Sequence, residues 1–415
     1  MIQTASIRIA TREIFRSDRH SSVILLSAAA LGLILANSQL AGAALAVKFH
    51  PLAVAPLGID LTLGGWVADA LLVVFFFIVA AELKNELTLG QLNTPRKAAV
   101  PLIGAVFGVA GPAVLYLVIG GGTAVEGWPI PTATDIAFAL GLLAVFGRGL
   151  PSNLRVFLLA LAVLDDLIGI ILIAVLFSND VNGAALAAAA LLVVCFAVLA
   201  RRLGRSPVAI GTLLGGLAVL CWYAVLQSGV HATLTGVALG LALPVRWGLS
   251  AAHHLQPWSN AIVLPLFAFS AALVPIPQLD ELSPVFLALA VALPVGKAVG
   301  ITIGGLLGGL LARRTGAARI EFGDLIAIAV TGGLGFTVAL LMNQLAFAGQ
   351  PQLMDQGALG VLTGSALSLL LGAALLHWRA RVHRARGAGQ GTAESGSGAL
   401  ATHESVAAGD APAHG

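Results

Sequence analysis

Long apolar segments separated by short polar loops repeat along almost the whole 415-residue chain. A helix that crosses a membrane needs about 20 apolar residues, whereas the strands of a membrane β-barrel alternate apolar and polar positions. The segments here do not alternate, so they predict spanning helices, about twelve of them at that length. We place these spans at residues 21–37, 66–84, 98–120, 124–146, 154–177, 183–200, 207–224, 229–244, 258–275, 285–312, 324–347 and 357–378.

The composition is that of a membrane protein. Hydrophobic residues make up 58% of the chain and charged residues only 10%, with a mean hydropathy of +0.97. Soluble domains are about 25% charged. The sequence therefore predicts an all-α polytopic membrane protein in contact with lipid. The net charge of +3 comes without a basic patch, and no nucleic-acid partner is expected.

The basic residues are distributed by loop. With twelve spans, 20 of the 22 Lys and Arg residues fall on one side of the membrane, Lys48 falls on the other, and Lys297 lies inside a span. The 20 are Arg8, Arg12, Arg16, Arg19, Lys84, Arg96, Lys97, Arg148, Arg155, Arg201, Arg202, Arg205, Arg246, Arg313, Arg314, Arg319, Arg379, Arg381, Arg384 and Arg386. The positive-inside rule places these loops and both termini in the cytoplasm.

The spans define a membrane domain over residues 1–386. Its longest outer loop, 38–65, contains a strand-like alternation over Gly58–Gly64, which makes it a candidate β-hairpin. Residues 387–415 are rich in Gly, Ala and Ser and have no apolar period. They are predicted to form a disordered cytoplasmic tail.

Two adjacent acids, Asp165 and Asp166, lie in the middle of the span at 154–177. An ionised carboxylate at mid-membrane costs about 2.5–3.5 kcal/mol on insertion scales, so the pair must face a polar cavity, bind a cation or take up protons. Neighbouring helical residues point about 100° apart. One acid should therefore face the ion path while the other meets a different partner, for which Lys297 is the candidate. Alternatively, these charges only pair to hold helices together.

Two other spans are predicted to be broken near their middles. Pro129 and Pro131 precede Asp135 in the span at 124–146, and Pro131 disfavours helix at the residue before it. The ends of broken helices carry partial charges. Asp135 could balance facing N-terminal ends, and Lys297 could balance facing C-terminal ends.

The second broken span is predicted at 324–347, where three glycines interrupt the apolar pattern: Gly332, Gly333 and Gly335. Close packing between helices is the alternative explanation for the glycines alone. A paired interruption in two halves of a chain indicates a transporter with inverted repeats and two crossing broken helices.

Three more polar residues lie near the ends of spans: Glu82, Glu86 and His231. The two glutamates form either a solvated helix end beside Lys84 or a mouth that attracts cations and responds to pH. His231 either caps and packs the end of its helix or makes a pH-responsive contact.

Seven runs occur in consistent order between about residues 8 and 385: AELKNEL, GWPIPTATDIAFALG, FLLALAVLDDL, SGVHATLTG, LPLFAF, VGKAVGI and GLGFTVAL. Together they resemble the NhaA-type sodium–proton antiporters. The resemblance implies a site at two crossed broken helices, with Asp166 as a central cation ligand and Asp165 as a second essential acid paired with Lys297. Asp135 would complete the site, and Thr134 matches a threonine beside it.

The same resemblance implies a pH-response role for Glu82, Glu86 and His231. It also implies a homodimer with contacts in the outer loop, and a location in the bacterial inner membrane. One departure concerns the segment from Arg246 to Trp258. The family often carries an acid there, whereas this chain has only His253 and His254.

We therefore expect a secondary active transporter, not an enzyme, that exchanges intracellular sodium or lithium for external protons by alternating access without a cofactor. Cation and proton would compete for Asp165 and Asp166, which titrate as a coupled set. If two acids discharge for each sodium ion, the exchange is electrogenic.

The sequence offers three alternatives to this function. An intramembrane aspartyl protease would need a Gly-x-Gly-Asp motif, and here Phe336 follows Gly335. A sodium-driven carrier of organic solutes would need more polar lining than these spans supply. Potassium exchange or proton-only transport stays open from the sequence.

Overall fold

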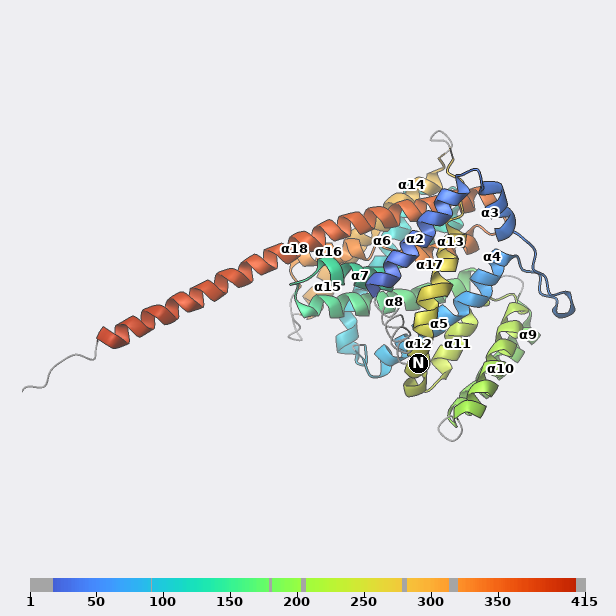
Figure 1. The fold of residues 1–415 in the computed structure, drawn as a ribbon, viewed down its shortest axis with the longest axis horizontal. Helices are drawn as coiled ribbons and strands as arrows, with labels where there is room; N and C mark the ends of the chain where they lie inside the picture. The colour runs from blue at the N-terminus through green and yellow to red at the C-terminus, as the bar shows by residue number, and fades with distance from the viewer. Residues whose placement is uncertain are drawn as a thin grey trace, which may run out of the picture.

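The computed structural model describes residues 18–90, 92–178, 181–202, 207–277, 282–312 and 320–407. This described part is a bundle of α-helices, in which strand pairing is limited to two isolated β-bridges (Figure 1). Some of the basic residues used to predict the orientation lie outside it: Arg8, Arg12, Arg16, Arg205, Arg313, Arg314 and Arg319.

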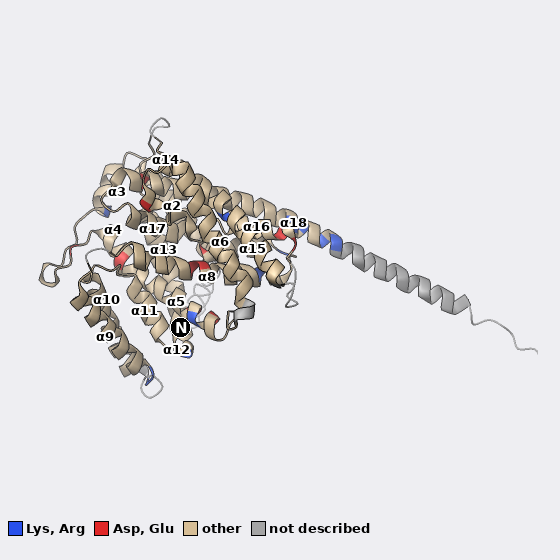
Figure 2. Ribbon diagram, turned by 180° about the vertical axis from the view of Figure 1, so that it is seen from behind, with Lys and Arg blue, Asp and Glu red and all other residues tan. Residues whose placement is uncertain are grey.

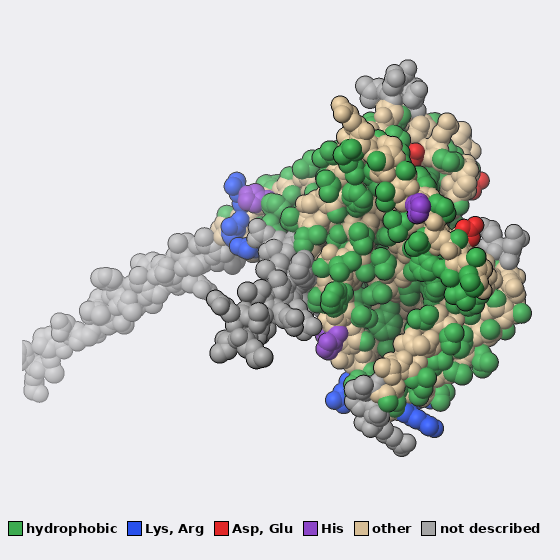
Figure 3. All heavy atoms as spheres, turned by 45° about the vertical axis from the view of Figure 1, so that its right-hand side comes forward, with side chains coloured by type: hydrophobic (Ala, Val, Ile, Leu, Met, Phe, Trp, Pro, Cys, Tyr) green, Lys and Arg blue, Asp and Glu red, His purple; other side chains and the backbone are tan. Residues whose placement is uncertain are grey.

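The outer surface of the bundle is apolar. Large side chains such as Ile34, Val118, Val175 and Leu370 are about two-thirds exposed or more, and Figure 3 shows hydrophobic side chains across the middle of the visible face. Soluble monomers rarely expose apolar patches of more than a few hundred Å². Such a surface suits hydrocarbon, so the predicted class of all-α polytopic membrane protein is confirmed.

The described helices alone account for fewer than twelve spans. Eight described helices are long and apolar enough to cross a membrane, or up to ten if each of two bent helix pairs is one span. The predicted span at 229–244 contains only the 9-residue helix α11 (Leu234–Ala242). The predicted span at 258–275 is divided among three elements described below. The number of twelve stays a prediction.

The described chain starts with α2 (Asp18–Ala36) and α3 (Ala41–Lys48), which are bent by 118° relative to each other. The β-bridges Pro51–Thr62 and Val54–Ile59 enclose the short helix η1 (Ala55–Leu57). The predicted outer loop at 38–65 thus holds a helix and a minimal antiparallel hairpin.

Two groups of helices share one order. In the first group, α4 (Leu63–Trp66), the π turn η2 (Val67–Leu71) and α5 (Leu72–Thr88) lead to a long helix, α6 (Pro95–Gly120). A broken span follows, made of η3 (Val125–Gly127), η4 (Ile130–Thr132) and α7 (Ile136–Phe146), and then a straight helix, α8 (Ser152–Leu176).

In the second group, α14 (Pro284–Val291), the π turn η7 (Ala292–Gly296) and α15 (Lys297–Ala312) form the straight helix. The broken span consists of α16 (Phe322–Thr331) and α17 (Phe336–Ala346), and α18 (Pro351–Ala407) is the final straight helix. The order of straight, broken and straight helix therefore occurs twice, while the inverted relation between the two groups stays a prediction.

Five described α-helices and one π turn connect these groups. The helices α9 (Gly183–Ala200) and α10 (Pro207–Leu226) lie side by side at one edge of the bundle and pack on α11 (Figure 1). The π turn η5 (Ser259–Val263) joins α12 (Val245–Trp258) to α13 (Leu264–Ala271).

Glycines bring α6 into close contact with η7 and α15. A Cβ atom at Gly300 would lie 2.2 Å from the carbonyl oxygen of Phe107, and one at Gly111 would lie 2.6 Å from that of Gly296. Only glycine leaves room for backbones this close. This contact fixes the position of Lys297, the first residue of α15.

Basic residues gather around α12, at the far end of the α9–α10 pair and where α18 leaves the bundle (Figure 2). We call this region the basic end. Lys84 donates to the Leu241 and Leu243 carbonyl oxygens just before α12, Arg246 lies in α12 and Arg201 caps α9. Arg379 lies on α18, and Arg148 precedes Gly149, which packs against Arg384 of α18. The backbone does not change at the predicted domain boundary after residue 386. Instead, α18 continues as a helix to Ala407, into the segment for which composition predicted disorder. The division into 1–386 and 387–415 stays a prediction.

Candidate ion-binding site

The first broken span is non-helical at residues 133–135. Ala133 has an extended backbone with ψ of 148°, and Asp135, with ψ of 103°, caps α7. Pro129 lies just before η4 and Pro131 lies within it. Each proline fixes its own φ and lacks an N–H, which favours the short turn of η4 over a continuous helix.

The second broken span bends by 50° between α16 and α17. Its three glycines have no positive φ, so they serve to admit neighbouring atoms rather than to allow an unusual backbone. A Cβ atom at Gly335 would lie 2.6 Å from the carbonyl oxygen of Ala133. The Asp135 N–H also donates to the Leu334 carbonyl oxygen at 2.5 Å. The two breaks therefore cross in direct backbone contact.

Asp135 lies at the N-terminal ends of both helices that leave this crossing. Its Oδ1 accepts a hydrogen bond from the Phe138 N–H of α7 at 3.3 Å. Its Oδ2 accepts from the N–H and the Oγ1 of Thr337 in α17, at 3.3 Å and 2.6 Å. Helix N-termini carry partial positive charge, so one carboxylate stabilises two of them. Thr337 was not among the site residues predicted from the sequence, although its place in the first turn after a break was a usable signal.

Lys297 lies against the other side of the crossing. Its Nζ is 2.5 Å from Asp165 Oδ2 and 2.9 Å from Thr134 Oγ1. Thr134 Oγ1 in turn donates to the Gly332 carbonyl oxygen, at the C-terminal end of α16, at 2.8 Å. Lys297 thus reaches that negative helix end through Thr134. Lys297 is fully buried and the Asp165 side chain is 2% exposed.

Asp166, unlike Asp165 and Lys297, lines a cavity of about 370 Å³. Thr134, Asp135 and Thr337 line it too. The two adjacent acids therefore have different surroundings, as their separation around the helix requires. The same cavity extends to Glu82 and Glu86 of α5, which neighbour Lys84 at the basic end.

His231 lies away from this cavity. Its Nδ1 is 3.4 Å from Asp69 Oδ1 in η2, and Trp222 Nε1 donates to the Asp69 carbonyl oxygen at 2.7 Å. The contact between Asp69 and His231 was not predicted from the sequence. The predicted pH-response role of His231 stays a prediction.

Comparison with known proteins gives the family. The sequence profile of the family described as Na+/H+ antiporter 1 matches residues 12–376. The chain is 53% identical over 410 residues to "Na(+)/H(+) antiporter NhaA 2" of Clavibacter michiganensis subsp. michiganensis, covering 97% of each protein. It is 43% identical to the NhaA of Nocardia farcinica, covering 89% of this chain and 91% of that one, and 42% identical to the NhaA of Tropheryma whipplei, covering 88% and 94%. The chain belongs to the NhaA family of Na+/H+ antiporters.

Membership of the NhaA family confirms that the chain is a transporter of Na+ and H+ and not an enzyme, and that it needs no cofactor. The protease alternative is therefore wrong. The roles of individual side chains are not decided by membership and stay predictions.

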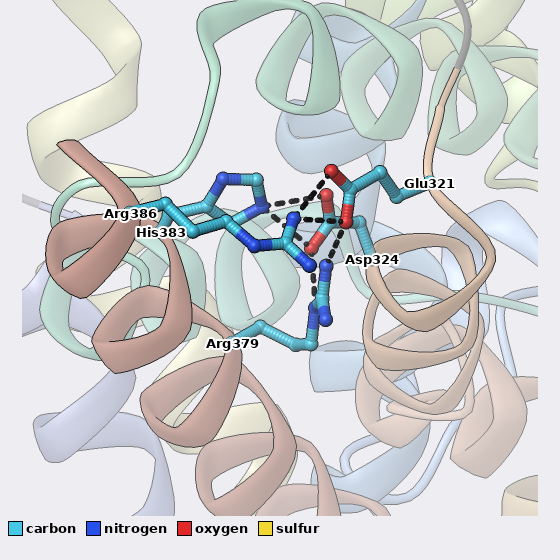
Figure 4. A network of polar contacts seen from close by, with 5 residues as sticks. All are labelled: Glu321, Asp324, Arg379, His383 and Arg386. Atoms are coloured by element: carbon cyan, nitrogen blue, oxygen red, sulfur yellow. Dashed lines mark hydrogen bonds and ion pairs between the residues drawn. The ribbon is translucent and has the colours of Figure 1, made fainter. Parts of the chain in front are cut away.

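A second charge network of this NhaA-family chain lies where α16 begins, beside the last described side chains of α18 (Figure 4). Asp324 accepts from Arg379 Nε at 2.7 Å and lies 2.9 Å from His383 Nε2. Glu321 accepts from Arg379 at 2.5 Å and from Arg386 at 2.7 Å. Hydrogen bonds from Arg379 and Arg386 hold the pKa of Glu321 below its ordinary value.

The acids of this network and His383 lie close enough together to hold a metal ion. Two arginines already bind the carboxylate oxygens, however, and a metal cation placed there would be repelled by both. We therefore interpret the network as a brace that joins α16 to α18.

Proposed function

We propose that this antiporter binds Na+ between Asp166 and Asp165, and that H+ competes for the same oxygens. The observation that supports this most strongly is the placement of Asp166, which lines a cavity that ends at the crossing of two broken spans. Asp165 Oδ1 is buried and has no hydrogen-bond partner among the described residues. With Thr134, these groups supply the hard oxygen ligands that small cations prefer.

Lys297 also competes with Na+ for the carboxylate of Asp165. It holds Asp165 Oδ2 in an ion pair, so a cation that approaches Asp165 must compete with the ammonium as well as with protons. Li+ has the same charge and ligand preference, so we propose it as a second substrate.

The transport cycle follows from these groups by alternating access. We propose that the basic end faces the cytoplasm, in accordance with the positive-inside rule, so that both termini are cytoplasmic and the cavity receives Na+ from inside a bacterial cell. Protons then enter from outside as Na+ leaves. We further propose that two protons exchange for one Na+ and that the protein acts as a homodimer in the inner membrane.

The test uses purified protein in proteoliposomes with an internal pH-sensitive dye. In wild-type vesicles an imposed Na+ gradient should move protons, and Asp166→Asn should reduce this movement to the background of empty vesicles because it removes the charged ligand. The matched control is Asp60→Asn, the same change in an exposed position of the outer loop, which should leave the rate unchanged.

Two results would contradict the proposal. Asp166→Asn vesicles that move protons at the wild-type rate would remove Asp166 from the site. Wild-type vesicles that respond equally to K+ and Na+ would show that the site does not select for small cations, and would favour the potassium alternative.

A further inference from the structure

The cavity that Asp166 lines is large enough for a hydrated ion. Its volume is about 370 Å³, and each water molecule takes about 30 Å³ in the liquid. An ion that enters it can therefore keep most of its water. Somewhere between the mouth near Glu86 and the floor at Asp166, that water must be exchanged for protein oxygens.

One wall of the cavity carries polar side chains along its depth. His253, Gln256 and Asn260 line it at helical spacing from α12 into η5, and Ser259 lines it beside Asn260. Residues three, four and seven apart share one face of a helix. Because α12 begins beside Arg246, this stripe runs from the basic end inward. His253 is exposed, Gln256 is half-buried, and Ser259 and Asn260 are 1% and 8% exposed.

The burial of Ser259 is not explained by the fold. Its Oγ is buried and has no hydrogen-bond partner among the described residues. A buried hydroxyl without a partner is unfavourable, and alanine would fit the same position. A buried hydroxyl in this position indicates a ligand that the described residues alone do not supply.

The backbone at this point departs from the α-helix. In η5 the Leu264 N–H donates to the Ser259 carbonyl oxygen, five residues back. Pro265 follows immediately, and a proline in a regular α-helix would clash with the carbonyl four residues before it. The π turn accommodates Pro265, and π turns are frequent at functional sites. Ser259 and Asn260 of this turn line the same cavity as Asp166.

We propose that Ser259 and Asn260 form a second, weaker Na+ position, at which the ion exchanges water for a hydroxyl and an amide oxygen before it reaches Asp166. This inference rests on the proposed site at Asp166. Hydroxyl and amide oxygens are hard ligands without charge, so they hold the ion less firmly than a carboxylate does. Transport requires such intermediate binding, favourable enough for the ion to enter and weak enough for it to leave. Glu82 and Glu86 of α5, which line the same cavity, attract the cation toward this position.

The test separates affinity from turnover. Na+-driven proton movement is measured in proteoliposomes over a range of Na+ concentrations for Ser259→Ala, Asn260→Ala and the double variant. Each single change should raise the KM for Na+ about three- to tenfold, as expected for one lost polar ligand, with a maximal rate close to wild type. Asn260→Ser keeps an oxygen and should recover part of the affinity. Ser270→Ala, on α13 outside the cavity, is the matched control.

A second variant distinguishes a change in Na+ affinity from misfolding. Asn260→Asp has the same shape and adds a charge at the proposed position, so it should lower the KM for Na+. An unchanged KM in all of these variants, or a lower maximal rate without a change in KM, would overturn the inference and leave Asp166 in its role. A failure of the main site is distinguishable from a failure of this inference. Asp166→Asn vesicles that exchange at the wild-type rate would overturn the main site, whatever the KM of the other variants.

Discussion

At the scale of single residues, Lys297 is the position where we expect a substitution to destabilise the protein most. It is fully buried with Asp165, and removal of one partner of such a pair leaves the other charge without compensation, at a cost of about 3–5 kcal/mol. We expect Lys297→Ala to lower the melting temperature in detergent and to change the pH profile of exchange. Lys48→Ala, at a half-buried lysine with no carboxylate in ion-pair distance among the described residues, should cost much less.

A double-mutant cycle identifies the pairing. If Asp165 is the partner, the double variant Asp165→Asn, Lys297→Ala should lose less stability than the sum of the two single losses, because neither charge is left unpaired. Additive losses of stability would show that the two residues are not energetically coupled and that Lys297 is stabilised by other groups.

The residues that sequence reasoning identified and those it missed differ in chemistry. Asp135, Asp165, Asp166 and Lys297 stand out because a charge in an apolar span always requires an explanation. Ser259 and Thr337 do not stand out, because serine and threonine are common in membrane helices and can satisfy their own hydroxyls. Their roles depend on partners that only folding brings close: Thr337 and Asp135 are 202 residues apart in the chain.

At the scale of helices, the crossing depends on α16 being held in place. The brace at its start joins Asp324, whose side chain is 2% exposed, to Arg379 and His383 of α18. Asp324→Asn keeps the shape and removes the buried charge, so that Arg379 keeps only the half-exposed Glu321 as a charged partner. We expect a loss of about 3 kcal/mol in unfolding free energy, measured as a lower melting temperature in detergent, and slower exchange with little change in the KM for Na+.

Glu321 provides the control within the same brace. Its side chain is 46% exposed, so Glu321→Gln should have a small effect at neutral pH. Its pKa is lowered in the folded protein. Its contribution to stability is therefore complete above the ordinary pKa of glutamate and disappears as the pH falls through the lowered value. Wild type and Glu321→Gln should converge in acid, and a difference that grows on acidification would contradict this.

At the scale of the whole molecule, hydropathy predicted the class of fold but not every boundary. It found the long apolar helices because their length must match the bilayer. It did not foresee that α11 has only 9 residues or that η2, η5 and η7 are π turns. A π turn shifts backbone hydrogen bonds without changing the composition of the segment. Hydropathy averaged over a window of residues therefore does not detect it. The crossing could be inferred from the prolines and glycines, whereas the backbone contact between Ala133 and Gly335 could not.

The whole molecule also determines whether the membrane potential drives transport. If two protons enter for each Na+ that leaves, one net positive charge crosses the membrane inward in each cycle. A potential of 100 mV is worth about 2.3 kcal/mol per charge, so an inside-negative potential of that size should raise the final Na+ gradient about 50-fold at a fixed pH difference. Proteoliposomes loaded with K+ and treated with valinomycin supply this potential, and the same vesicles in equal K+ on both sides are the control. A final Na+ gradient that follows the pH difference alone would mean that each Na+ exchanges for one proton. In that case the acids and Lys297 would release a single proton per cycle, and the ion pair between Asp165 and Lys297 would persist while Na+ is bound at Asp166.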